Sequence, residues 1–83
     1  MRKILIIEDE DLIREELEIL LSNEGYRVES AAEFHHVTDL VKSFCPDLIL
    51  LDINLPDRDG YRLCADIRSF TDTPIMFITG RDT

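Results

Sequence analysis

Residues 48–52 of the chain are Leu48-Ile49-Leu50-Leu51-Asp52, four aliphatic residues closed by an aspartate. An unbroken aliphatic run of this length is typical of a strand buried on both faces of a parallel sheet, because an exposed face would bring in polar residues at every second position. Residues 3–7 have the same character, since Ile4-Leu5-Ile6-Ile7 is followed at once by Glu8 and Asp9. The two stretches predict two central strands, each ending at an acid.

Helical and strand patterns alternate along the rest of the chain. The elements predicted after the first strand are a helix ending at Asn23, an edge-like strand at 26–30, a helix at 34–44, the strand at 48–52, a helix at 61–70 and a strand at 74–78. Gly25 is placed to end the first helix in a left-handed turn, and Pro46 ends the second. This alternation predicts an α/β fold of right-handed βαβ units, with a parallel sheet covered on both faces.

Length and charge limit what the chain can be. Its 83 residues allow a single domain. The net charge of -9, with nine Lys and Arg against eighteen Asp and Glu, argues against direct contact with nucleic acid, which needs clustered basic residues.

The first aliphatic run is too short for a signal peptide or a membrane span. Cys45 and Cys64 are interpreted as small buried hydrophobes in a reducing compartment, so a cytoplasmic protein is expected.

Polar side chains follow three of the predicted strands. They are Glu8 and Asp9 after the first strand, Asp52 and Asn54 after the third, and Thr79 with Gly80 after the fourth. In an open parallel sheet the binding crevice lies beyond the carboxyl ends of the strands. If these strands are neighbours, the polar groups meet in one acidic pocket.

Carboxylates gathered so closely repel one another, and a divalent cation removes that penalty. Oxygen ligands without a nearby His or Cys favour Mg²⁺, which proteins bind through one or two carboxylates together with water and a phosphate oxygen. Such an ion would also bring a phosphoryl group to an attacking carboxylate. Asp52 is the best candidate nucleophile, because it sits where a rigid strand ends.

Simpler interpretations exist for several of these residues. Asp9 on its own could complement the helix dipole at the start of the first helix. Thr79 on its own is more often a cap or a turn residue. His35 and His36 are better explained by a solvated helix face than by metal ligation.

Three blocks of the sequence jointly resemble bacterial response-regulator receiver domains. They are Ile4-Leu5-Ile6-Ile7-Glu8-Asp9-Glu10, Asp47 to Pro56 with Asp59-Gly60, and Pro74-Ile75-Met76-Phe77-Ile78-Thr79, in the family's order and spacing. The resemblance spans the whole chain. It implies a flavodoxin-like doubly wound sheet with strand order 2-1-3-4, and residues 1–83 would then be a partial receiver domain.

The resemblance also implies a role for each site residue. Asp52 resembles the phosphoacceptor, Asp9 the direct Mg²⁺ ligand, and Glu8 the acid that binds the metal through water. Asn54 resembles the residue that lends its backbone carbonyl to the metal. The switch hydroxyl is matched by Thr79, and Gly80 stands where a small residue keeps the site open.

The last three elements of the family's domain have no counterpart in this sequence. Receiver domains continue with a further helix, a fifth strand that ends in a phosphate-pairing lysine, and a fifth helix. The lysines of this chain are Lys3 and Lys42, neither placed for that role, and the planar guanidinium of Arg81 is a poor substitute. Without those elements, residues 74–78 would form an edge strand and half of one sheet face would be bare, so either a fragment or an oligomer that pairs through this strand is expected.

The leading functional hypothesis is a signalling module, not an enzyme, that accepts a phosphoryl group from a histidine kinase onto Asp52 with Mg²⁺. By analogy with regulators that carry a winged-helix domain, the full-length output would be transcription. One alternative is an interaction module whose acidic site is inactive, because the lysine is missing. Another is an aspartate-nucleophile phosphatase, although such enzymes usually place the nucleophile on the first strand with a second Asp two residues later.

Overall fold

The computed structural model describes residues 2–32, 36–52 and 60–78. Strands and helices alternate strictly in this part of the chain, as the sequence predicts. The elements are β1 (Lys3–Ile7), α1 (Asp11–Asn23), β2 (Arg27–Ala31), α2 (Val37–Phe44), β3 (Leu48–Asp52), α3 (Gly60–Arg68) and β4 (Ile75–Ile78). The predicted elements are all present, with bounds that differ by a few residues at their ends.

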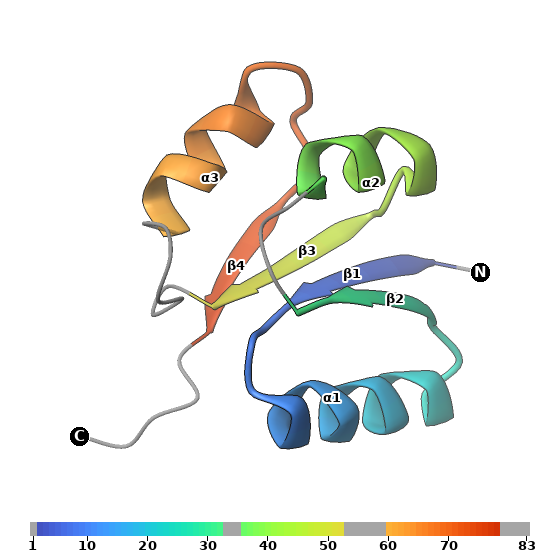
Figure 1. The fold of residues 1–83 in the computed structure, drawn as a ribbon. Coiled ribbons are helices and arrows are strands. Elements are labelled where there is room, and N and C mark those ends of the chain that lie inside the picture. The colour runs from blue at the N-terminus through green and yellow to red at the C-terminus, as the bar shows by residue number, and fades with distance from the viewer. Residues whose placement is uncertain (1, 33–35, 53–59, 79–83) are drawn as a thin grey trace.

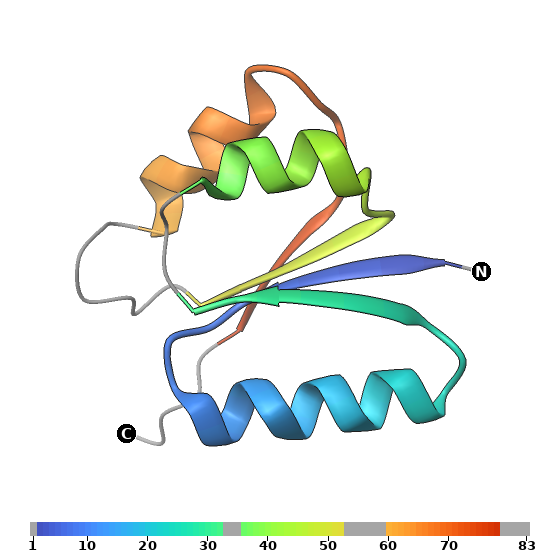
Figure 2. The same cartoon turned by 45° about the vertical axis from the view of Figure 1, so that its right-hand side comes forward.

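All strand pairs in the four-stranded sheet are parallel, and the strand order is β2-β1-β3-β4. The predicted order 2-1-3-4 is therefore confirmed. Figures 1 and 2 show α1 on one side of the sheet and α2 and α3 together on the other. The central strands β1 and β3 are thus covered from both faces, which explains why they carry aliphatic residues at successive positions.

Alternate residues of the central strands feed two separate apolar clusters. Leu5, Ile7, Ile49 and Leu51 point toward α2 and α3, where they pack with the buried residues Val37, Val41, Phe44, Leu63 and Ile67. Ile4, Ile6 and Leu50 point toward α1 and pack with the half-buried residues Leu17, Leu21, Val28, Leu48 and Ile78. The sheet is therefore the shared wall of both clusters and holds the ends of β1 and β3 rigidly.

The end of α1 follows the prediction for Gly25. This glycine has a φ of 96°, and its N–H donates to the Ser22 carbonyl while the N–H of Tyr26 donates to the Leu21 carbonyl. This pair of bonds is the Schellman arrangement that ends many helices.

Cys45 does not lie in the core, so its interpretation as a buried hydrophobe is wrong. It is exposed, whereas Cys64 is half-buried. Cys45 adopts a left-handed conformation (φ 53°) at the end of α2, and its Sγ donates to the Lys42 carbonyl instead of packing. The turn that leads into Pro46 carries the side chain away from the core.

The sheet face that was expected to be half bare is covered more completely than predicted. Ile4 and Leu50 are only 4% and 7% exposed, because Leu17 and Leu21 of α1 pack against their cluster. A hollow of about 370 Å³ remains beside α1, lined by Arg2, Ile4, Leu21, Tyr26, Asp47, Leu48, Leu50 and Met76. The strand β4 lies at the edge of the described sheet, as expected, with Met76 54% exposed.

Candidate metal centre

The carboxyl ends of β1 and β3 lie side by side, because Ile7 pairs with Leu51 in the parallel register. Glu8 directly follows β1, and Asp52 is the last residue of β3. Both side chains are buried, and Asp9 beside them is half-buried. The sheet therefore brings Asp52 next to two acids that are more than forty positions away in sequence, as predicted.

Each of the three carboxylates offers an oxygen within 4.8 Å of the other two. Two carboxylate oxygens, Glu8 Oε1 and Asp9 Oδ1, are buried and have no hydrogen-bond partner. A buried carboxylate oxygen without a partner costs stability unless a cation is near it. The arrangement fits a hard cation such as Mg²⁺, which takes oxygen ligands.

The pKa of the Glu8 carboxyl also reflects how close these three acids are. Burial, together with the neighbouring Asp52 and Asp9 carboxyls, raises the pKa of its carboxyl from the ordinary 4.5 to about 7, although the hydrogen bond from the N–H of Glu10 acts in the opposite direction. A bound cation would favour the ionised form and reverse this shift.

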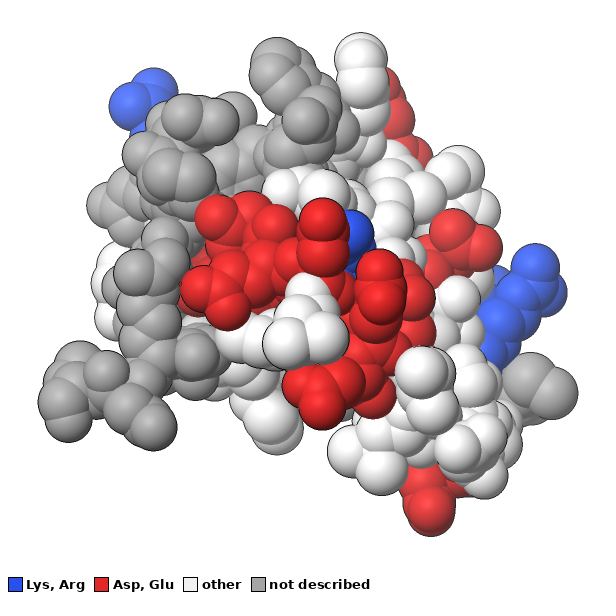
Figure 3. Space-filling view, turned by 60° about the horizontal axis from the view of Figure 1, so that its bottom comes forward, with Lys and Arg blue, Asp and Glu red and all other residues white. Residues whose placement is uncertain are grey.

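The surroundings of the site attract cations. Figure 3 shows acidic side chains gathered into a broad patch on the side of the molecule where α1 lies, with little positive charge among them. The sequence of α1 contributes Asp11, Glu15, Glu16 and Glu18. A negative field of this kind concentrates cations and repels anions.

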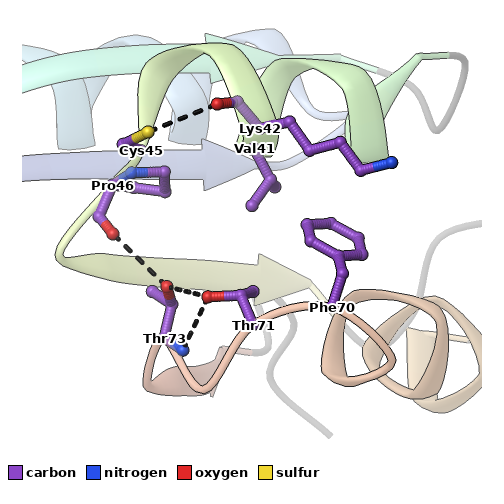
Figure 4. A pocket seen from close by; sticks show the side chains of 7 residues that line it. All are labelled: Val41, Lys42, Cys45, Pro46, Phe70, Thr71 and Thr73. Carbon is purple, nitrogen blue, oxygen red and sulfur yellow. Dashed lines mark hydrogen bonds between the residues drawn. The ribbon is translucent and has the colours of Figure 1, made fainter.

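A different kind of hollow lies at the other end of the sheet, by the amino ends of β3 and β4 (Figure 4). Its volume is about 260 Å³, and its lining residues are Val41, Lys42, Cys45, Pro46, Phe70, Thr71 and Thr73. The Lys42 ammonium lies 4.8 Å from the centre of the Phe70 ring, and the Thr71 and Thr73 hydroxyls bond to one another. With no acid in its lining, this hollow does not share the chemistry of the strand ends.

Other predicted site residues lie outside the described residues. They are Asn54, Thr79, Gly80, Arg81 and His35. His36 is exposed, and its Nδ1 lies 3.7 Å from Asp39 Oδ2, which agrees with a solvated helix face. None of the helices in the described ranges is long and apolar enough to cross a bilayer.

Sequence reasoning missed Arg14. Its guanidinium binds the main chain at Glu8 and the side chain of Asp11. A basic residue one helical turn after a run of four acids was the available signal, because Asp11 and Arg14 stand at the spacing of an i,i+3 ion pair.

The family model described as the response regulator receiver domain matches residues 4–83. The chain belongs to this family. Among curated relatives, the receiver is 46% identical over 81 residues to the transcriptional regulatory protein YxdJ of Bacillus subtilis (strain 168). The match covers 98% of this chain and 35% of the relative, so the receiver spans about a third of that protein's length.

Solved structures agree with the fold. The N-terminal domain of the nisin resistance regulator NsrR superposes with a TM-score of 0.89 at 38% identity, covering all of this chain and 70% of that one. The BeF3-activated receiver domain of Klebsiella pneumoniae RstA gives 0.89 at 30% identity, covering 99% and 70%. The chemotaxis protein CheY4 of Vibrio cholerae gives 0.89 at 28% identity, covering 100% and 72%. The flavodoxin-like receiver fold expected from the sequence is thereby confirmed.

Proposed function

We propose that this receiver accepts a phosphoryl group from a sensor histidine kinase onto Asp52, with Mg²⁺ as the required ion. The observation that supports the proposal most directly is the group of three carboxylates at the ends of β1 and β3, two of which have buried oxygens without a partner. Such an arrangement is costly in an apo protein and useful only when a cation is bound.

In this proposal Asp52 is the nucleophile. It closes a strand in which Ile49, Leu50 and Leu51 are buried, so its carboxylate is held in one place for in-line attack. A carboxylate oxygen forms a bond to phosphorus while the bond from phosphorus to the kinase histidine breaks, and the electron pair returns to the imidazole. Receiver and kinase thus exchange one phosphoryl group, with no other product.

The metal ligands would be Glu8, Asp9 and Asp52, joined by the backbone carbonyl of Asn54. When bound, Mg²⁺ would neutralise the acids and stabilise the negative charge of the phosphoryl oxygens during transfer. Glu8 would act through water, and its ionised form is the one a cation selects. The hydroxyl of Thr79 completes the proposed set as the group that moves toward the phosphoryl oxygens.

The role of the longer protein is inferred from its relative YxdJ. Because YxdJ is named a transcriptional regulatory protein, we propose that the longer protein controls transcription in the cytoplasm through a part outside this chain. The receiver itself is not expected to contact nucleic acid, since its net charge of -9 opposes binding to phosphates. It is also not expected to hydrolyse free phosphate esters, and a standard phosphatase assay would test this.

An interaction module with an inactive site is a second candidate, and the positions of the lysines favour it. Lys3 donates through Nζ to the Phe44 carbonyl at 2.9 Å, and Lys42 lies over Phe70 in the hollow of Figure 4. Both lie at the amino ends of the strands, away from Asp52. As the sequence predicts, neither can pair with a phosphoryl group there.

Beryllofluoride separates the two candidates, because it stands in for the phosphoryl group on an aspartate. If the chain is a working phosphoacceptor, it should bind beryllofluoride only with Mg²⁺. Treatment with acetyl phosphate should then increase the mass of the chain by one phosphoryl group. Asp52→Asn should abolish both results, whereas Asp72→Asn, the same change at an exposed acid before β4, should abolish neither. A wild-type chain that takes up neither reagent would support the interaction module.

Self-association through β4 is a further part of the proposal. Met76 and Phe77 are exposed large hydrophobics on this edge strand, and exposed apolar edges favour pairing with another chain. Met76→Lys should shift the molecular mass measured by sedimentation toward that of a monomer. A wild-type chain that is already monomeric at every concentration would contradict this part.

A further inference from the structure

Arg14 lies in the first turn of α1, and its guanidinium reaches back to the connection that carries Glu8 and Asp9. Its side chain is only 16% exposed, which is low for an arginine. Nη1 donates to the main-chain carbonyl of Glu8 at 3.0 Å, and Nη2 donates to Asp11 Oδ1 at 2.6 Å. The planar guanidinium therefore joins the residue after β1 to the start of α1.

Two further hydrogen bonds hold Glu8 in place. Its N–H donates to the Ala31 carbonyl at 3.0 Å, and its Oε2 accepts from the N–H of Glu10 at 3.1 Å. Its Oε1 is the buried oxygen that has no partner. The main chain and one carboxylate oxygen are thus tied down, and the remaining oxygen is presented to the site.

The connection between β1 and α1 has no ordinary helix cap to stiffen it. Glu10 occupies the N-cap position in an extended conformation, and its side chain makes no capping hydrogen bond. Repulsion among Glu8, Asp9 and Asp52 would tend to push this connection outward in the metal-free protein. A charge-assisted hydrogen bond from a largely buried arginine opposes that movement.

We propose that Arg14 is a positioning residue for the metal ligands Glu8 and Asp9. It acts by holding the carbonyl of Glu8, and so the main chain on which both ligands are mounted. It does not bind the ion or the phosphoryl group. This inference rests on the proposed function, since it requires that these acids bind a divalent cation.

The sign of the effect distinguishes positioning from charge. A positive charge close to a cation site weakens cation binding, so removing it should tighten binding if charge were the whole role of Arg14. If Arg14 positions the ligands, removing it should weaken binding even though the molecule becomes more negative. Loss of a group that orients metal ligands commonly costs ten- to a hundredfold in affinity.

The experiment is a titration of the metal-free chain with Mn²⁺, followed through the electron paramagnetic resonance signal of the free ion. Arg14→Met keeps most of the apolar stem, removes the donors and should weaken binding about tenfold. Arg62→Met, the same change at an exposed position on α3, is the matched control and should leave the affinity unchanged or slightly tighter. Arg14→Lys keeps the charge without the two-pronged donor and should fall between wild type and Arg14→Met.

Thermal melting without metal accompanies each titration, so that a loss of fold is not taken for a loss of ligands. If Arg14→Met is folded and binds Mn²⁺ as tightly as wild type or more tightly, the inference is overturned. Should Arg14→Met fail to fold, Arg14→Lys decides, and unchanged affinity in that variant overturns the inference. A wild-type chain that binds no Mn²⁺ would instead overturn the metal site of the proposed function.

Discussion

At the scale of single residues, Glu8 is a charged group placed where burial and repulsion from neighbouring acids oppose its ionisation. It is fully buried, and its carboxyl lies beside those of Asp9 and Asp52. Each of its other groups is used, because its N–H, its carbonyl and Oε2 all have partners. Oε1 is thus the oxygen of Glu8 that has no partner, while the rest of the residue is held in place, as expected of a metal ligand.

The raised pKa of Glu8 predicts how stability depends on pH without metal. Between about 4.5 and about 7 the folded chain holds this proton more tightly than the unfolded chain, so the stabilisation is complete below pH 4.5 and is lost as the pH rises to 7. Glu8→Gln cannot ionise and should lack this slope. The difference between variant and wild type should change by up to about 3 kcal/mol across the interval.

Urea denaturation in a chelator at several pH values measures this difference. The comparison with Glu8→Gln removes the contribution of the other acids, which both proteins share. Parallel stability curves for the two proteins would contradict the prediction. Mg²⁺ should flatten the wild-type curve near neutral pH, because it binds the ionised carboxylate.

At the scale of elements, the two ends of α1 are built differently. The amino end has no side-chain cap but is joined to the Glu8 carbonyl by Arg14, whereas the carboxyl end is closed by main-chain bonds around Gly25. Gly25 adopts a positive φ of 96°, which residues with a Cβ rarely do. The end of α1 distant from the site therefore depends on one glycine.

Gly25→Ala is expected to destabilise the chain by about 1 kcal/mol. A Cβ at this position would meet no atom within 4 Å, so the cost comes from the backbone conformation alone. Asn23→Ala, two residues earlier and still helical, is the control and should be neutral or slightly stabilising. Urea denaturation of the three proteins checks this, and equal loss in both variants would show that the turn is not the cause.

At the scale of the whole molecule, one sheet supports two apolar clusters and one acidic edge. The cluster beneath α2 and α3 is the larger, and Leu5 is completely buried in it. Burial of β1 and β3 from both faces keeps the strand ends in register, so Glu8 and Asp52 stay adjacent. The stability of the core and the geometry of the site are thus properties of the same two strands.

Leu5→Ala should cost about 2 to 5 kcal/mol, because it removes packed methyl groups and leaves a cavity. Leu20→Ala is the matched control, since Leu20 on α1 is 58% exposed and its truncation should change stability by less than about 0.5 kcal/mol. Thermal or urea melts provide the measurement. A similar loss in both variants would mean that the cluster under α2 and α3 is not the main core.

Local patterns in the sequence were enough to predict the helices and strands. The aliphatic runs that end at Glu8 and Asp52 predicted both central strands, and Gly25 predicted the end of α1. Periodicity and turn chemistry report on neighbours along the chain, so they work without knowledge of the rest of the molecule. The acids at the strand ends were visible for the same reason.

The meeting of those acids could be predicted from the residues only under the condition that β1 and β3 are neighbours. The strand order itself came from the family resemblance, because a repulsive pair such as Glu8 and Asp52 leaves no local trace in sequence. Cys45 was misassigned, since its exposure depends on a left-handed turn rather than on its hydrophobicity.

The sequence by itself determined which segments are strands and helices and which acids stand at their ends. Only the tertiary structure decided that three carboxylates lie within 4.8 Å, that two of their oxygens are buried without partners, and that Arg14 holds the Glu8 carbonyl. The physical reason is distance along the chain. Burial and long-range contact depend on register and packing across the sheet, whereas secondary structure depends mainly on residues a few positions away.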